Sequence, residues 1–265
     1  MNIFQTIILG IIEGLTEFLP VSSTGHMIIA SSFMGIDKEA FTKLFEIVIQ
    51  LGAILAVVVI YWRKFFDFTR WKFFLKLFIA VLPACLIGLL FESRIKILLA
   101  SPLTVGISTL IGGIFLLFVD GWFQKPITDR DEDLGNFAAL KIGFWQVLAM
   151  IPGTSRSAAS IVGGMQQKLT RRFAAEFSFF LAVPTMVAAT GYELFKSLKS
   201  NPTLLKDHHN VELLLLGSLI AFIVAMMAIK SFIGYLQKHG FKLFGVYRIF
   251  MGVFIILLVY MGYLR

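Results

Sequence analysis

The sequence predicts an all-α integral membrane protein with six transmembrane helices, two re-entrant broken helix hairpins and an inverted-topology repeat. Three observations lead to this prediction. Apolar residues make up 58% of the chain and charged residues 15%, and the mean hydropathy is +0.85, which exceeds what a soluble globular domain needs. Six apolar stretches are long enough to cross a bilayer. Two further stretches carry polar residues in the middle of an apolar run.

The six predicted transmembrane helices approach the length of about 20 residues that the hydrocarbon core requires. They lie at residues 43–62, 72–91, 103–119, 174–194, 212–229 and 241–264. The other two stretches, 3–35 and 137–166, contain Pro, Gly, Ser, Thr and charged residues. Proline removes a backbone donor and interrupts a helix, and non-helical backbone within a membrane is tolerated only inside protein or along a cavity. We therefore expect these two stretches to be broken or re-entrant helices.

The two broken stretches resemble each other at a fixed separation. Residues 20–24 (PVSST) precede residues 152–156 (PGTSR) by 132 positions, and the same separation pairs Phe41 with Phe173. Each half, 1–132 and 133–265, then holds one broken stretch and three spans, and an odd number of crossings makes the second half enter from the opposite face. The sequence thus predicts a single membrane domain, residues 1–265, built from two inverted pseudo-repeats.

The charge distribution predicts an orientation. Lys and Arg outnumber Asp and Glu by 24 to 16, and no basic stripe with interleaved aromatic residues suggests nucleic-acid binding. The connections 63–72, 168–172 and 230–242 are basic, which places them in the cytoplasm and both termini outside. The acidic segment 129–133 is interpreted as a solvated linker without chemistry.

Three other features are interpreted as structural or left open. Cys85, the only cysteine, excludes a disulfide framework and a thiolate metal site. Gly10 and Gly14 form a GxxxG pattern, which favours close helix packing. Glu46 and Gln50 share a helix face and stay candidates for a supporting role beside a site.

Glu13 and Glu17 are the first candidates for chemistry. Their i, i+4 spacing places both carboxylates on one helix face, about 6 Å apart along the axis. Their repulsion grows at low dielectric, so the pair would bind a proton or hold a cation. Mg²⁺ or Ca²⁺ fits best, because both prefer oxygen ligands and accept phosphate beside them. The alternative is that both acids merely face water, although acids within a membrane are costly.

The residues after Pro20 supply hydroxyl groups and a histidine. Ser22, Ser23 and Thr24 suit the start of a new helix, whose free N–H groups would attract an anion. Ser23 or Ser22 is a candidate nucleophile, and His26, one turn on, is a candidate for proton transfer. Helix capping with a hydrogen-bonded histidine is the structural alternative.

The second broken stretch has the same build and adds Arg156. A guanidinium within an apolar segment needs an anion, and its planar fork suits phosphate oxygens. An internal ion pair with Glu13 or Glu17 is the alternative. Small hydroxyl residues that could join a phosphate cradle or cap the backbone are Thr154, Ser155, Ser157 and Ser160.

Together the two stretches supply paired acids, two helix N-termini, hydroxyl groups, a histidine and a guanidinium. This combination is typical of phosphoryl transfer, in which positioning and charge neutralisation supply most of the catalysis. A lipid transporter or flippase is an alternative, since inverted repeats with broken helices also build transport sites. Transport would need the guanidinium and polar N-termini, but not the serine, the histidine and the paired acids.

Residues 13–26 (EGLTEFLPVSSTGH) and 152–157 (PGTSRS) closely resemble the undecaprenyl-diphosphate phosphatase family, known for bacitracin resistance. The resemblance spans essentially the whole chain and includes residues 45–52 (FEIVIQLG) and 176–179 (EFSF). Where members of that family often have Gly and Thr after the second motif, this chain has Ala158 and Ser160, which affects only the fine geometry of the cradle.

The resemblance implies hydrolysis of undecaprenyl diphosphate to undecaprenyl phosphate and inorganic phosphate, for peptidoglycan synthesis, in the bacterial inner membrane with a site open to the periplasm or exterior. It assigns Glu13 and Glu17 to a divalent cation, Ser23 to nucleophilic attack, His26 to acid or base catalysis, and Arg156 with Ser155 to the diphosphate. The remaining expected substrate contacts are Ser22, Thr24, Thr154, Ser157 and Ser160. The expected partners are the polyprenyl diphosphate and membrane lipids. A homodimer, the identity of the metal, and an activated water in place of Ser23 are left open.

Overall fold

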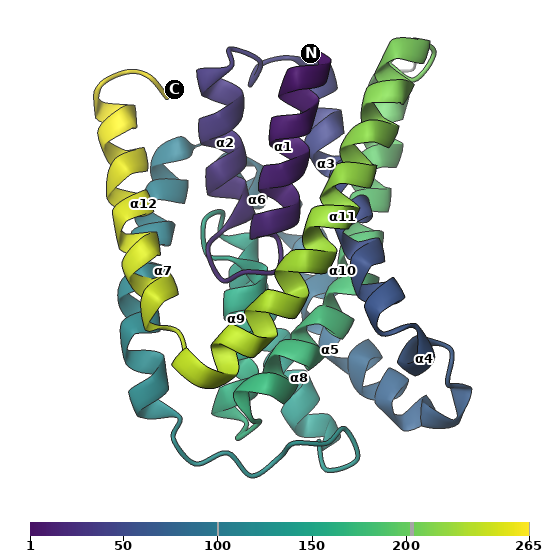
Figure 1. The fold of residues 1–265 in the computed structure, drawn as a ribbon, viewed down its shortest axis with the longest axis vertical. Helices are drawn as coiled ribbons and strands as arrows, with labels where there is room; N and C mark the ends of the chain where they lie inside the picture. Colours follow the sequence, from purple (N-terminus) through teal and green to yellow (C-terminus); the bar gives the residue numbers. More distant parts are fainter. Residues whose placement is uncertain (100, 202–203, 265) are drawn as a thin grey trace.

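A computed structural model describes residues 1–99, 101–201 and 204–264 of the chain (Figure 1). Within these residues the chain forms α-helices and short 3-10 turns, and no β-sheet. One isolated bridge joins Thr128 to Leu169. The predicted all-α class is confirmed.

Six helices in the described residues are long and apolar enough to cross a membrane. They are α3 (Ala40–Ile60), α5 (Trp71–Leu90), α7 (Pro102–Trp122), α10 (Arg171–Ser200), α11 (His208–His239) and α12 (Lys242–Tyr260). Large apolar side chains lie exposed along them, such as Leu215 (67% exposed) and Phe250 (73% exposed). Such a surface is suited to lipid rather than water, so the prediction of a multi-pass membrane protein with six spans is confirmed.

The two longest helices extend well beyond the apolar stretches that predicted them. α10 has 30 residues and α11 has 32. The additional turns carry Arg, Lys, Gln and His side chains, which a hydropathy pattern excludes but which a helix accepts outside a bilayer. Three short helices, α4 (Trp62–Phe65), η1 (Phe68–Arg70) and α6 (Glu92–Leu99), occupy connections for which no structure was predicted.

Both polar stretches fold as helix pairs with a break between them. The first hairpin consists of α1 (Ile3–Thr16) and α2 (Ser23–Phe33), and the second of α8 (Asn136–Val147), the 3-10 turn η2 (Leu148–Met150) and α9 (Arg156–Gln166). In Figure 1, α1 and α2 lie in the upper half, near both termini, and α8 and α9 lie below them. The predicted breaks are confirmed. Re-entry from opposite membrane faces, and the repeat with halves 1–132 and 133–265, stay predictions.

Glycines allow each hairpin to pack closely on a long helix. A Cβ on Gly10 would lie 3.0 Å from the carbonyl oxygen of Gly217 in α11, and one on Gly14 would lie 2.7 Å from that of Ala221. A Cβ on Gly143 of α8 would overlap the carbonyl oxygen of Ala80 in α5. The interpretation of the Gly10 and Gly14 pair as a close-packing motif is therefore confirmed.

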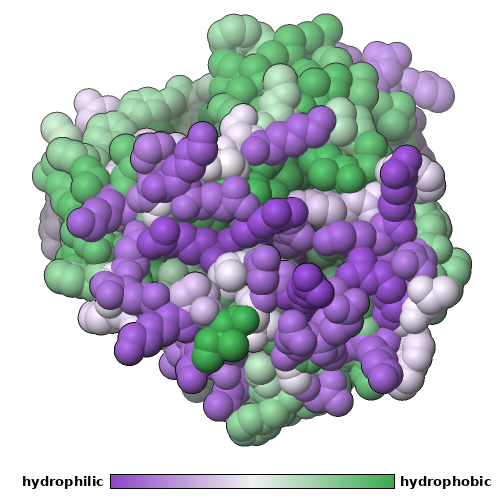
Figure 2. All heavy atoms as spheres, turned by 60° about the horizontal axis from the view of Figure 1, so that its bottom comes forward, coloured by the Kyte–Doolittle hydropathy of each residue, from purple (hydrophilic) through white to green (hydrophobic). Residues whose placement is uncertain are grey.

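The three basic connections lie together at one end of the molecule. In Figure 1 this is the lower end, opposite both termini, and Figure 2 shows that its surface is largely hydrophilic. The acidic segment between the halves lies at the same end, and its residues other than Asp131 are exposed, as expected for a solvated linker. The Asp131 carboxylate accepts a hydrogen bond from Arg70 over 2.5 Å, and the Asp131 carbonyl oxygen accepts one from Lys76, also over 2.5 Å.

Candidate active site

A serine in a strained backbone conformation caps the second helix of each hairpin. Ser22 has φ 71° and ψ 93°, and Ser155 has φ 72° and ψ 117°. Residues other than glycine rarely adopt these values. Ser22 Oγ accepts a hydrogen bond from the Gly25 N–H over 3.4 Å, and Ser155 Oγ accepts one from the Ala158 N–H over 3.3 Å. The same capped turn therefore brings a helix N-terminus to the break in both hairpins.

The structural correspondence between the hairpins differs by one residue from the sequence repeat. α2 begins at Ser23 and α9 at Arg156, which are 133 positions apart, whereas the two prolines are 132 apart. Gly153 accommodates the additional residue: its φ is +91°, and a Cβ there would overlap the carbonyl oxygen of Val105. Ser23 and Arg156 are consequently equivalent, since each is the first residue of the second helix in its hairpin.

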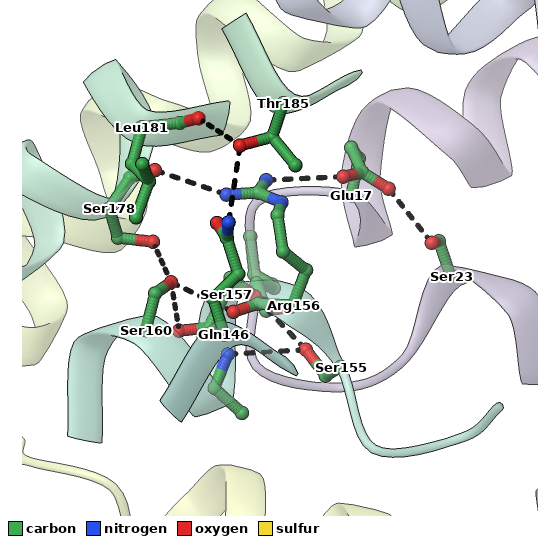
Figure 3. A network of polar contacts seen from close by, with 12 residues as sticks. Glu17, Ser23, Gln146, Ser155, Arg156, Ser157, Ser160, Ser178, Leu181 and Thr185 are labelled. Carbon is green, nitrogen blue, oxygen red and sulfur yellow. Dashed lines mark hydrogen bonds and ion pairs between the residues drawn. The ribbon is translucent and has the colours of Figure 1, made fainter. Parts of the chain in front are cut away.

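The two hairpins meet through Glu17, Ser23 and Arg156 (Figure 3). Arg156 Nη2 donates a hydrogen bond to Glu17 Oε1 over 3.1 Å, and Ser23 Oγ donates one to Glu17 Oε2 over 2.9 Å. Arg156 Nη1 donates to the Ser178 carbonyl oxygen over 3.1 Å. The structure thus brings an acid of one hairpin against the guanidinium of the other. The internal ion pair considered as the alternative for Arg156 is present, and its partner is Glu17.

A cavity of about 250 Å³, here called the polar cavity, adjoins this ion pair. The predicted site residues that line it are Glu17, Ser22, Ser23, Thr24, Ser155 and Arg156. Gln50, Gln146 and Thr185 add polar groups from the long helix α3, from α8 and from α10. Gln50 was considered from the sequence, but Gln146 and Thr185 were missed, because a single amide or hydroxyl in an apolar helix carries no distinctive pattern.

Several buried polar atoms at this site lack a hydrogen-bond partner. Among the described residues, four buried side-chain oxygen or nitrogen atoms have none, and three of these are Glu13 Oε1, Gln146 Oε1 and Arg156 Nε. Gln146 and Arg156 line the polar cavity, and Glu13 lies one helical turn before Glu17. Buried polar groups are normally hydrogen-bonded. Their concentration here indicates a place that binds a polar group.

Glu13 and Glu17 can supply part of a site for a divalent cation. Glu13 is 1% exposed with an unpartnered oxygen, and Glu17 accepts from Arg156 and Ser23. Across the described ranges, no group of three or more His, Cys, Asp or Glu side chains could hold a metal ion. The two carboxylates would therefore need phosphate and water oxygens to reach roughly six ligands. The assignment of a metal to Glu13 and Glu17 stays a prediction.

Three of the predicted substrate-binding residues make other contacts. Ser157 Oγ donates to the Leu19 carbonyl oxygen over 2.8 Å and so joins the second hairpin to the loop of the first. Ser160 Oγ donates to the Arg156 carbonyl oxygen over 2.8 Å and lies 2.6 Å from Ser178 Oγ. Neither serine lines the polar cavity, and Thr154 lines a separate groove beside α7.

His26 contacts Tyr247 rather than Ser23. His26 Nδ1 lies 2.8 Å from the Ser22 carbonyl oxygen, and Nε2 lies 2.5 Å from the Tyr247 hydroxyl of α12. A carbonyl can only accept, so Nδ1 carries the proton and a neutral ring accepts from tyrosine at Nε2. The two rings stack with centroids 5.6 Å apart. The role of His26 in proton transfer stays a prediction.

Arg248 of α12, which the sequence analysis did not single out, holds the loops of both hairpins. Its side chain is fully buried and donates to five backbone carbonyl oxygens. These are Pro20 (3.3 Å), Gly153 (2.8 Å), Thr154 (2.8 Å), Thr109 (3.3 Å) and Ser108 (3.4 Å). One guanidinium therefore connects the first loop, the second loop and α7. The available signal was an arginine within an apolar span, which is costly unless it serves a function.

The groups at this cavity have the chemistry needed to bind a phosphate group and to attack its phosphorus. A serine hydroxyl that donates to a carboxylate has the geometry of a nucleophile and its base. A guanidinium and two helix N-termini on the same cavity favour an anion.

Comparisons with known proteins agree with this geometry. The family model described as bacitracin resistance protein BacA matches residues 6–254. A protein of Flavobacterium psychrophilum named undecaprenyl-diphosphatase is 56% identical over 258 residues, which cover 97% of this chain and 96% of that protein. A protein of the same name from Bdellovibrio bacteriovorus is 48% identical over 265 residues, which cover 99% of this chain and 98% of that protein. Because these matches extend over nearly the whole chain, it belongs to the BacA family of bacitracin resistance proteins.

Proposed function

We propose that the protein hydrolyses undecaprenyl diphosphate to undecaprenyl phosphate and inorganic phosphate, and so recycles the carrier lipid of peptidoglycan synthesis. The observation that carries the proposal is the placement of Ser23 and Arg156 on the two oxygens of Glu17 at one cavity. Relatives named undecaprenyl-diphosphatase support the same activity. A lipid transporter is not favoured, because transport has no use for a serine paired with a carboxylate.

Ser23 begins the reaction by attacking the terminal phosphorus of the lipid diphosphate. Its proton passes to Glu17 Oε2, which lies 2.9 Å from Ser23 Oγ. The bond between that phosphorus and the bridging oxygen breaks, and undecaprenyl phosphate leaves. Water then attacks the phosphoserine, and the bond between phosphorus and Ser23 Oγ breaks. Glu17 gives its proton back to Ser23 Oγ, which restores the hydroxyl, while one proton of the attacking water passes to solvent and inorganic phosphate leaves. A water activated by Glu17 in place of Ser23 is the alternative for the first attack.

Arg156 and Glu17 are coupled in this scheme. Before attack, the ionised Glu17 holds one end of the guanidinium over 3.1 Å, and Arg156 Nε has no partner. When Glu17 accepts the serine proton, its attraction for Arg156 weakens, and the guanidinium can turn toward the charge that develops on the phosphate oxygens. Proton transfer to Glu17 therefore releases the cation at the step that needs it.

Glu13 and Glu17 are the residues that would hold the divalent cation, Mg²⁺ or Ca²⁺. Such an ion, when bound, neutralises diphosphate charge and helps to orient the substrate. The unpartnered Glu13 Oε1 supports this assignment. Glu13 has no other role in the scheme, so the metal explains why a buried acid lies one turn from Glu17.

The polar cavity is proposed to be reached from the exterior of the cell. The basic connections lie at the end opposite both termini, which supports a cytoplasmic position for that end. We also propose that two copies of the chain form a homodimer. The mass of the detergent-solubilised protein tests this.

Phosphate release from undecaprenyl diphosphate by the purified protein, with and without chelator, tests the proposed function. We expect release by the wild type, loss with chelator, and recovery on addition of Mg²⁺ or Ca²⁺. The Glu13→Ala, Glu17→Ala double variant should be inactive, whereas Glu212→Ala, which removes an exposed acid of α11, should match the wild type. No release by a folded wild-type protein would refute the proposal, and full activity of the double variant would refute the role of the acids.

A further inference from the structure

An apolar groove lies between α5 and α10, beside the polar cavity. Its volume is about 450 Å³, which is in the range of roughly 300–1,000 Å³ for sites that bind small molecules. Its lining includes Ala84, Cys85, Gly88, Leu89 and Ala188. Leu89 is 69% exposed, so this side of the groove faces the surrounding lipid.

The groove and the polar cavity are continuous. Ala84, Met150, Thr185 and Ala189 line both. The chemistry changes at Thr185, whose hydroxyl accepts from Gln146 over 3.1 Å and donates to the Leu181 carbonyl oxygen over 2.8 Å. A molecule with an anionic group beside Arg156 therefore finds hydrocarbon walls directly next to that group.

Gly88 keeps the groove wide near this junction. A Cβ at Gly88 would meet the terminal methyl group of Met150 at 3.2 Å and, apart from the neighbouring backbone of α5, no other described atom within 4 Å. The far end of the groove is polar, because Glu92 accepts from Tyr192 over 3.0 Å and from Lys196 over 2.7 Å. The groove thus leads from the anion site along apolar walls to a bridge between α6 and α10.

A second apolar groove provides a comparison within the same molecule. It has a volume of about 370 Å³ and lies against α7 and α8, where Ile111 and Phe115 line it. It shares no described lining residue with the polar cavity, and Arg248 and Thr154 form its inner end. Apolar character alone therefore does not distinguish the two grooves, whereas continuity with the anion site does.

We propose that the groove between α5 and α10 holds the isoprene units that adjoin the diphosphate of the lipid substrate. This inference rests on the proposed function. The occupant that fits is an amphiphile whose hydrocarbon begins directly at its phosphates, because three of the four residues that line both the polar cavity and the groove are the apolar Ala84, Met150 and Ala189. A polyprenyl diphosphate has this form, whereas a phospholipid has a glycerol backbone between its phosphate and its acyl chains.

Gly88→Trp tests the assignment by filling the groove next to the polar cavity. We expect the KM for undecaprenyl diphosphate to rise about 10-fold with little change in kcat, since chain binding is lost equally from the ground and transition states. The inhibition constant of methylenediphosphonate, which is the headgroup without a chain, should stay within about twofold. Ile111→Trp fills the comparison groove and should leave both constants at the wild-type values.

Cys85 gives a second test that does not depend on a bulky substitution. It is the only cysteine of the chain and lines the groove, so an apolar maleimide reports on this position alone. A polyprenyl methylenediphosphonate should slow the labelling of Cys85, and methylenediphosphonate alone should not. The Cys85→Ser, Ile111→Cys variant carries its thiol in the comparison groove, where the same lipid should give no protection.

The outcomes separate the two proposals. Absence of phosphate release from any polyprenyl diphosphate by the wild type would overturn the proposed function. An active wild type with unchanged KM in Gly88→Trp, together with unprotected Cys85, would overturn the groove assignment alone. Equal protection of Cys85 by a phospholipid would also overturn it, because the groove would then bind any acyl chain.

Discussion

The two hairpins share a backbone and differ in chemistry. Their capping serines agree within 1° in φ (71° and 72°) and 24° in ψ (93° and 117°), and both caps serve the third residue of the following helix. The first helical residue is Ser23 in one hairpin and Arg156 in the other. A repeated turn thus supplies two similar anion-attracting helix ends, and in the proposed mechanism a single divergent position gives attack to one hairpin and charge neutralisation to the other.

The helices that precede the two turns differ as well. The first carries Glu13 within α1 and Glu17 directly after it, whereas α8 carries the neutral Gln146. If both helices carried acids, repulsion would oppose binding of a diphosphate. The difference agrees with the proposed roles, in which the first hairpin handles protons and the divalent cation and the second binds the anion.

The largest effect on kcat should come from replacing Ser23, the first residue of the second helix in the first hairpin. Ser23→Ala should lower kcat by at least about 10³-fold, because it removes the attacking atom. Acid-quenched wild type incubated with substrate labelled in the terminal phosphate should contain phosphoprotein, and the variant should contain none. Ser22→Ala, which removes the neighbouring cap, should instead lower stability by about 1 kcal/mol. A Ser23→Ala enzyme within tenfold of wild type would assign the attack to water.

The second-largest effect should come from replacing Arg156, the equivalent position of the second hairpin. Arg156→Lys keeps the positive charge but loses the planar fork, so phosphate release should fall roughly 10²–10³-fold with little change in thermal stability. Arg172→Lys, at the basic end of the molecule, should serve as the control with activity near wild type. Unchanged kinetics in Arg156→Lys would mean that the guanidinium serves only its ion pair with Glu17.

The residue that joins the two loops should affect both stability and rate. Arg248→Lys cannot reach five carbonyl oxygens, so we expect a loss of about 3 kcal/mol in unfolding free energy. Displaced loops should also lower kcat by roughly 10²-fold, because small misplacements of catalytic groups are costly. Thermal unfolding in detergent and phosphate release measure the two effects. A fall in stability with unchanged kcat would show that Arg248 does not position the site.

The smallest effects should come from single contacts that hold the hairpins. Ser157→Ala removes one of two donors to the Leu19 carbonyl oxygen, which keeps the Val21 N–H over 2.8 Å, and should cost about 1 kcal/mol of stability. Tyr247→Phe removes the partner of His26 Nε2 and should change kcat less than about tenfold. A much larger fall in kcat for Tyr247→Phe would indicate that the tyrosine and histidine move a proton together.

The sequence predicted the elements better than their contacts. The six spans follow from runs of apolar residues, and the breaks follow from Pro20 and Pro152, because both signals are local. The lengths of α10 and α11 were underestimated. Hydropathy detects only the apolar part of a helix that crosses the bilayer, and not the polar turns that continue the helix beyond it. The partners of Arg248 and His26 could not be found, because they depend on how distant segments pack. The predicted offset between the two hairpins was 132 positions, whereas their second helices begin 133 positions apart. Gly153 adds one residue to the second turn, and no periodicity in the sequence reveals it.

The carbonyl contacts of Arg248 also influence groups that it does not touch. The described peptide bonds are trans, so a carbonyl and the N–H that follows it point in opposite directions. Because Arg248 holds the Thr154 carbonyl oxygen, it also fixes the direction of the Ser155 N–H, which points away from Arg248, in a turn whose residues Ser155 and Arg156 line the polar cavity. A cation buried behind the turn thereby fixes a backbone dipole next to the polar cavity, and we expect this to pre-organise anion binding without competition for the ligand.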